Sequence, residues 1–149
     1  MSNIMDLDGP EYAPAAGGKP KKIVLLLHGL GADGDDLIGL APHIAPALPD
    51  AAFVSPHAPF PCDMAPYGRQ WFSLQERSPT AILAGVQAAR PILDAFIDRL
   101  LNRFALTDSD LALVGFSQGT MMSLYAAPRR ARAIAGIVGF SGALVGPDR

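Results

Sequence analysis

The sequence is poor in cysteine, in charge and in basic clusters, and each shortage excludes a class of protein. The single cysteine, Cys62, excludes an internal disulfide framework and a C-x-x-C metal or redox site. Charged residues make up 17% of the chain and the formal net charge is −2, whereas nucleic-acid binding needs clustered Lys and Arg. No apolar run approaches the roughly 18–20 residues of a bilayer span, and residues 1–18 lack the features of a secretory signal. We therefore expect a soluble, cytoplasmic protein with no nucleic-acid partner and no membrane span.

What the chain does contain is enough apolar surface for one folded domain. Half of its 149 residues are apolar. The 15 glycines and 14 prolines are spread between apolar segments, so they are interpreted as turn residues rather than as a sign of disorder. Residues 1–20 are polar and weakly patterned, which predicts a flexible lead-in. Residues 21–149 are predicted to form the folded domain.

Apolar runs and helical patterns alternate along the chain. We expect strands over four short apolar runs, at 23–27, 52–55, 111–114 and 133–140. We expect helices with one apolar face at 37–48, 80–104 and 120–127, and a long loop at 57–78. This alternation predicts an α/β fold, with a mostly parallel sheet and helices on both faces. The last run lacks in/out alternation, which is typical of a strand covered on both faces.

The most informative motif is G-x-S-x-G at 115–119. A strand is expected before it and a helix after it, which is the context of a nucleophile elbow. Such a turn holds its serine in a strained conformation, and the flanking glycines let the strand and the helix pass closely. Ser117 is therefore the candidate nucleophile.

A serine nucleophile needs two further groups. A neighbouring base must take the hydroxyl proton. Backbone N–H groups must form an oxyanion hole, in which each donor is worth about 2.7–4 kcal/mol. Gln118 follows the serine and offers one such N–H, and the second donor is expected from the loop at 28–31, after an earlier strand.

With these motifs the chain resembles the small carboxylesterases related to phospholipases and acyl-protein thioesterases, which have the α/β-hydrolase fold. The resemblance covers residues 22–145, approximately. It is carried by the segments 27–34 (LHGLGADG), 36–37, 56–59, 71–72 and 115–119 (GFSQG).

The resemblance implies a role for several residues. Ser117 would be the nucleophile, and the N–H groups of Leu30 and Gln118 would form the oxyanion hole. The pocket for a small or medium ester would be lined by Trp71, Phe72 and Met64. The family's reaction uses no cofactor, and no metal site is implied.

The sequence departs from the family pattern after the elbow. The family continues with two strands whose ends carry the catalytic aspartate and histidine, but no histidine follows Ser117 here. The chain is therefore expected to be the N-terminal two-thirds of such a domain, without its C-terminal strands. Three alternatives stay open: an active esterase, an incomplete fragment or binding relic, and half of a split hydrolase. A homodimer or a complementing C-terminal segment is the expected protein partner.

The three histidines have explanations other than catalysis. His43 falls between the apolar positions of its helix and is expected to face solvent. His28 is expected to pack and hydrogen-bond within its loop. His57 follows a strand and could lie near the same sheet edge, so it and His28 are the only candidates for a base present in the chain.

Four other polar features are given structural explanations. The aspartates near a helix start are expected to cap it; they are Asp33, Asp35 and Asp36. Ser141 lies in a second elbow-like segment that lacks the closing glycine, so a strand-end turn is expected. Cys62 has no Cys-His signature and is expected to be a small loop residue.

Overall fold

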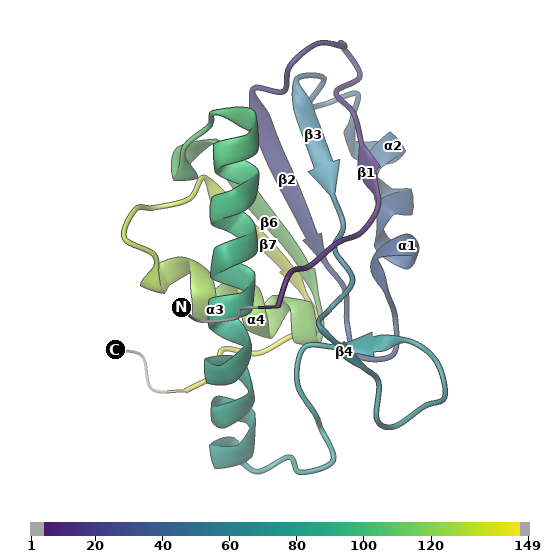
Figure 1. The fold of residues 1–149 in the computed structure, drawn as a ribbon, viewed down its shortest axis with the longest axis vertical. Coiled ribbons are helices and arrows are strands. Elements are labelled where there is room, and N and C mark those ends of the chain that lie inside the picture. Colours follow the sequence, from purple (N-terminus) through teal and green to yellow (C-terminus); the bar gives the residue numbers. More distant parts are fainter. Residues whose placement is uncertain (1–4, 147–149) are drawn as a thin grey trace.

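The sheet has five strands in the order β1-β3-β2-β6-β7 (Figure 1). The computed structural model describes residues 5–146. β2 pairs in parallel with β3 and β6, β6 pairs in parallel with β7, and only β1 is antiparallel to its neighbour β3. The strands are β1 (Glu11–Tyr12), β2 (Lys22–Leu27), β3 (Ala51–Val54), β6 (Leu111–Phe116) and β7 (Gly136–Phe140). The predicted mostly parallel sheet is confirmed.

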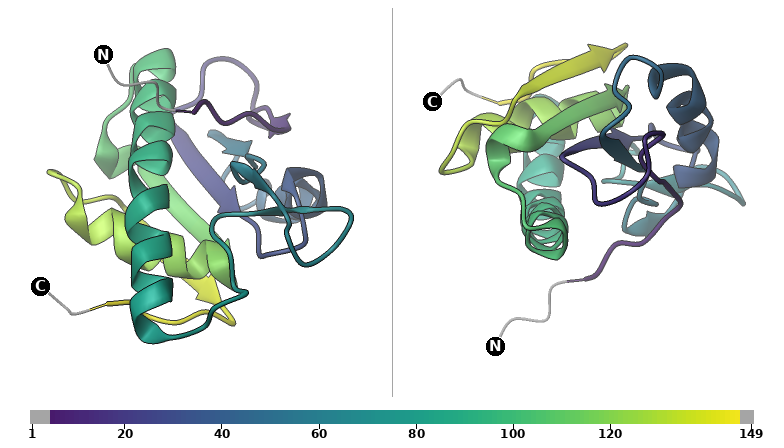
Figure 2. Two further views of the ribbon diagram at one scale, coloured as in Figure 1. Left: turned by 60° about the horizontal axis from the view of Figure 1, so that its bottom comes forward. Right: turned by 90° about the horizontal axis from the view of Figure 1, so that it is seen from above.

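Helices cover both faces of this sheet, as the alternating pattern predicts. α3 and α4 lie on one face, and α1 and α2 lie on the other (Figures 1 and 2). The helices are α1 (Gly34–Leu37), α2 (Ala41–Ile44), α3 (Pro79–Phe104) and α4 (Gln118–Ala126). Short 3₁₀ helices span Ile38–Leu40, Asp108–Asp110 and Ala127–Arg129.

The central strand β2 divides the core into two halves. Ile23, Leu25 and Leu27 pack with α3 and α4, whereas Val24 and Leu26 pack with the α1–α2 segment. Side chains alternate between the faces of a strand, so a strand covered on both sides must be apolar at every position. This geometry explains the continuous apolar run at 23–27.

The segment after β2 forms an irregular helix, as its prolines predict. The Asp33 side chain accepts hydrogen bonds from the N–H groups of Asp35 and Asp36, and the Asp36 side chain accepts one from the Asp33 N–H. This reciprocal pair is a capping box. Capping is therefore confirmed for Asp33 and Asp36, whereas Asp35 takes part through its backbone N–H.

α3 is the long helix of the fold, and it begins at Pro79, one residue before the expected start. Within residues 5–146 it is the one helix long and apolar enough to cross a membrane by length and composition, although no such run was expected. Its buried face packs into the main core, a placement that also occurs in core helices of globular domains.

The part of the lead-in that the structure describes is attached to the domain. β1 pairs with the edge of β3, Leu7 is buried in the main core, and its carbonyl accepts a hydrogen bond from Arg99 of α3. Glu11 and Arg103 form a bidentate ion pair. These contacts come from residues far along the chain, and the flexibility of the lead-in stays a prediction. Residues 1–4 and 147–149 lie outside the described residues.

Arg130, just after α4, ties three segments together. Its guanidinium contacts Asp94 and Asp98 of α3 at 3.0 and 2.6 Å, and Asp108 at 2.6 Å. Burial alone would lower the pKa of Arg130, but the hydrogen bonds that its guanidinium donates to the three carboxylates raise that pKa above its ordinary value. The cluster fixes the end of α4 against α3.

β7 forms one edge of the described sheet. It begins at Gly136 rather than at residue 133 as expected, and Val138 and Phe140 are 54% and 45% exposed. The ring of Phe140 stacks on that of Phe116 of β6 at 5.0 Å. The prediction of a strand covered on both faces therefore does not hold within residues 5–146.

Candidate active site

Ser117 stands at a sharp turn between β6 and α4. Its φ of 53° and ψ of −112° are rarely adopted by a residue with a side chain, and such strain clusters at functional sites. A Cβ at position 115 would lie 2.6 Å from the Thr120 nitrogen, and one at Gly119 would collide with the Leu27 carbonyl. Both flanking glycines are therefore required by close backbone approach, and the predicted strand–turn–helix geometry of an elbow is confirmed.

The elbow is anchored to the end of β7. The Ser117 N–H donates to the Phe140 carbonyl at 2.8 Å. Thr120, one turn into α4, uses its hydroxyl twice: it donates to that carbonyl and accepts from the Phe140 N–H. These bonds hold the first turn of α4 against the sheet edge.

The loop after β2 lies directly against the serine. A Cβ on Gly29 would be 3.1 Å from the Ser117 Cβ and 3.8 Å from its Oγ. Within residues 5–146, the N–H groups of Leu30 and Gln118 donate to no protein acceptor, whereas the neighbouring N–H of Gly31 donates to the Arg69 carbonyl. Both N–H groups are thus free to bind an acceptor. Their assignment as the oxyanion hole stays a prediction.

His28 is buried, and both of its ring nitrogens are engaged. Nε2 accepts the Ala58 N–H at 2.9 Å, so this nitrogen carries no proton. Nδ1 then carries the proton and donates it to the Gly29 carbonyl at 2.7 Å. Burial lowers the pKa of His28. The expectation that His28 packs and hydrogen-bonds in its loop is confirmed, and this ring has no free nitrogen to serve as a base.

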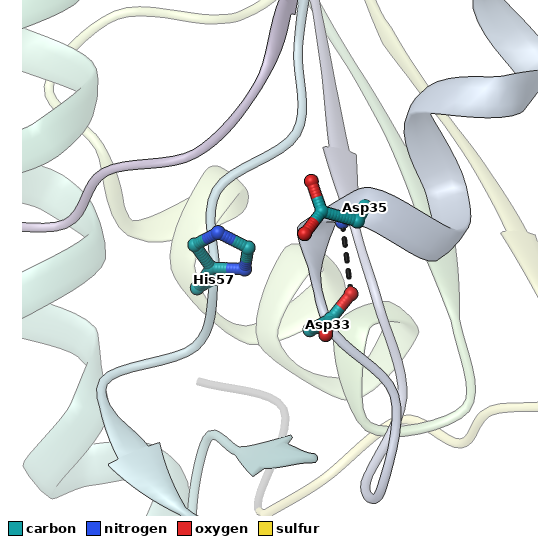
Figure 3. A group of neighbouring side chains, drawn as sticks. All are labelled: Asp33, Asp35 and His57. Carbon is teal, nitrogen blue, oxygen red and sulfur yellow. Dashed lines mark hydrogen bonds between the residues drawn. The ribbon is translucent and has the colours of Figure 1, made fainter.

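His57 lies at the start of α1, close to Asp33 and Asp35 (Figure 3). Its Nδ1 accepts the Gly34 N–H at 3.0 Å. Side-chain atoms of the three residues lie within 4.8 Å of one another, a spacing that a metal ion could use. The capping bonds of Asp33 and the Gly34 contact of His57 account for the cluster without a ligand. His43 of α2 is exposed, as expected.

The three residues predicted to line the substrate pocket differ in burial. Trp71 and Phe72 are 0% and 5% exposed and belong to the main core, whereas Met64 is 51% exposed on the long loop. Their role in substrate binding stays a prediction. That loop contains a small hairpin of β4 (Phe60–Pro61) and β5 (Arg69–Gln70).

Two side-chain roles were missed by sequence reasoning: that of Arg69, and that of Gln118, of which only the backbone N–H had been considered. The side chain of Arg69 donates to the carbonyls of Ala58 and Pro59, and its backbone bonds to Gly31 and Ala32. The Gln118 side chain is buried and bonds to the Trp71–Phe72 backbone. Neither set of contacts has a local sequence signal, because the partners are distant in the chain.

An apolar cavity of about 480 Å³ opens beside the elbow helix. It is lined by Leu83 of α3, Met121 of α4 and Leu144 and Val145 after β7, among others. Met121 lies one turn beyond Ser117. Ser141 has a φ of 54°, close to that of Ser117, but no helix follows it within residues 142–146, in agreement with the expected strand-end turn.

Comparisons with known proteins agree on one family. A sequence model described as phospholipase/carboxylesterase matches residues 13–149. Esterase YpfH of Escherichia coli K12 is 30% identical over 122 residues, which are 82% of this chain and 52% of that protein. The chain thus spans about half the length of this curated relative.

Solved structures extend the comparison. The structure of esterase PE8 has a TM-score of 0.91 and 42% identity, with 96% of this chain and 67% of that chain covered. A carboxylesterase from Mesorhizobium loti has a TM-score of 0.70 at 23% identity, over 88% of this chain and 59% of that one. The second likeness concerns the fold alone.

Proposed function

The chain belongs to the phospholipase/carboxylesterase family and has the α/β-hydrolase fold, and on this basis we propose that it acts as a serine carboxylesterase on small or medium esters. The observation that carries the proposal is the strained, half-buried Ser117, next to Gln118 and to the loop that contains Leu30, whose N–H groups have no protein acceptor within residues 5–146. In this proposal the serine forms an acyl-enzyme. No cofactor takes part.

The proposed reaction has two halves. The Ser117 oxygen attacks the ester carbonyl carbon while a base takes its proton, and the carbonyl oxygen becomes an oxyanion. The N–H groups of Leu30 and Gln118 stabilise that charge, each by about 2.7–4 kcal/mol. The carbon–oxygen bond to the alcohol then breaks, and the alcohol leaves with the proton. Water attacks the acyl-enzyme in the same way and releases the acid.

The cavity beside α4 supports binding of the apolar part of the ester. Its volume of about 480 Å³ falls within the usual range of ligand sites, roughly 300–1,000 Å³. Met121 follows the nucleophile by one turn of α4 and contributes to the lining, so the cavity lies beside the helix that begins at the elbow. In the proposal the acyl chain lies here, near Leu83 and Leu144.

The placement of the histidines favours a second candidate function. Within residues 5–146, no hydrogen bond joins a histidine to the Ser117 hydroxyl, and both nitrogens of His28 are bonded elsewhere. The second proposal is a site that binds esters without turnover, or one that a separate chain completes. Loss of the base costs on the order of 10⁶ in kcat, so the turnover of p-nitrophenyl esters separates the two candidates.

Labelling with a fluorophosphonate tests the nucleophile directly. The adduct should map to Ser117 by peptide mass spectrometry, and Ser117→Ala should abolish it while circular dichroism stays unchanged. Ser141→Ala is the matched control, because Ser141 has a similar backbone angle but no helix behind it. Labelling at Ser141 or at Cys62 would contradict the assignment.

A further inference from the structure

The side chain of Gln118 forms hydrogen bonds to a loop that is distant in the sequence. The side chain is fully buried, whereas its backbone N–H donates to no protein acceptor within residues 5–146. Its Oε1 accepts the Trp71 N–H at 2.8 Å, and its Nε2 donates to the Phe72 carbonyl at 2.5 Å. One carboxamide therefore satisfies two adjacent backbone groups that lie more than forty residues earlier in the chain.

Trp71 in turn contacts the loop after β2. Its indole N–H donates to the His28 carbonyl at 3.0 Å, and its ring lies 6.1 Å from the His28 ring. The side chain is fully buried. A continuous path thus runs from the start of α4, through Trp71, to the segment that presents the Leu30 N–H.

We propose that the Gln118 carboxamide is a positioning group that docks Trp71 and thereby sets the spacing between the two N–H donors beside Ser117. The assignment of those donors as an oxyanion hole rests on the proposed function, but the docking of Trp71 does not. The elbow and the loop after β2 belong to different strands. Their relative position is also constrained by the pairing of β2 with β6, by the close approach of Gly119 to Leu27, and by that of Gly29 to Ser117.

A glutamate at position 118 provides a switchable version of this contact. The Gln118 carboxamide uses one acceptor and one donor here, and a neutral carboxylic acid offers one acceptor and one O–H donor, so Gln118→Glu should keep Trp71 docked while protonated. Once ionised it has no donor, and a buried negative charge would face the Phe72 carbonyl. Burial raises the pKa of a carboxyl, so the switch should lie above the ordinary value of about 4.3.

Trp71 is the only tryptophan in the chain, so its fluorescence reports the docking without any catalytic assay. Acrylamide quenching and emission maximum would be measured from pH 4.5 to 8.5. The wild type should stay protected throughout. Gln118→Glu should be protected at acid pH and several-fold more quenched at pH 8. Gln118→Met, which keeps the volume and loses both bonds, should be quenched at every pH.

Two controls separate docking from other effects. Gln87→Glu introduces the same change on the exposed face of α3 and should behave as the wild type. His28 is the titratable side chain in contact with Trp71, and the wild-type and methionine profiles contain its contribution. Far-UV circular dichroism identifies any variant that unfolds. If the variants unfold, the proposal is tested by hydrogen exchange in the wild type, in which the Trp71 backbone and indole N–H groups should both be strongly protected.

A glutamate variant that stays folded and protected at pH 8, a methionine variant as protected as the wild type, or rapidly exchanging Trp71 N–H groups would overturn the proposal. Fluorophosphonate labelling is followed in parallel, and Gln118→Met should slow it at least tenfold. If the wild type is not labelled at all, the esterase proposal fails while the fluorescence result still stands.

Discussion

Replacing His28 with leucine should lower the free energy of unfolding by about 2–4 kcal/mol. The His28 side chain is fully buried, and so is Ala58, whose N–H it accepts. Leucine fills a similar volume but leaves that N–H unpaired, at a cost of about 1–3 kcal/mol. The Gly29 carbonyl also loses its partner, but it is only half-buried and can bind water, so its share is smaller. The loss is a large part of a typical total of 5–15 kcal/mol.

A glutamine at position 28 should cost less than the leucine, because its carboxamide oxygen can still accept the Ala58 N–H. The two variants also differ from the wild type in pH dependence. Burial lowers the pKa of His28 in the folded state, so the unfolded chain takes up a proton near pH 6.5 that the folded state resists. His28 therefore contributes its full stability above about pH 6.5, and that contribution is lost as the pH falls toward the folded pKa.

Urea unfolding followed by circular dichroism between pH 5 and 8 measures both effects. The wild type should lose stability on acidification more steeply than His28→Gln, which has no group to titrate there. A leucine variant as stable as the wild type at pH 7.5 would refute the claim that the unpaired Ala58 N–H lowers the free energy of unfolding. A glutamine variant with the wild-type pH slope would refute the assignment of that slope to His28.

Three further predictions concern residues other than His28. Gly119→Ala should destabilise the protein and slow fluorophosphonate labelling, because the new Cβ meets the Leu27 carbonyl, whereas Gly39→Ala, which opens onto free space, should be neutral in the same denaturation assay. Arg130→Ala should cost about 3 kcal/mol in urea unfolding, since it leaves Asp98 and the largely buried Asp108 without their cation, whereas Asp94 keeps Arg90; a loss below 1 kcal/mol would mean that solvent replaces the guanidinium. The exposed apolar edge of β7 should promote association, so light scattering should detect species larger than 15.6 kDa that Val138→Lys reduces, and a monomeric wild type would contradict this.

The four longer strands and the elbow could be predicted from the sequence because their signals are local, whereas the two-residue strands β1, β4 and β5 were not predicted. The apolar run 23–27 predicts a strand, because burial on both faces requires apolar residues. The motif at 115–119 predicts a sharp turn, because a close strand–helix approach requires glycine. The cap at Asp33 is equally local. Each depends on neighbours within a few positions.

The sequence by itself determined the α/β fold, the identity of the candidate nucleophile and the family resemblance. Only the tertiary structure decided what the buried polar side chains do. The His28 tautomer depends on Ala58, thirty positions later, and the Gln118 side chain reaches Trp71 across forty-seven positions. Arg69 and the ordered β1 segment are further cases. A buried polar group must find a partner wherever the fold brings one, and that partner leaves no periodic trace in the chain.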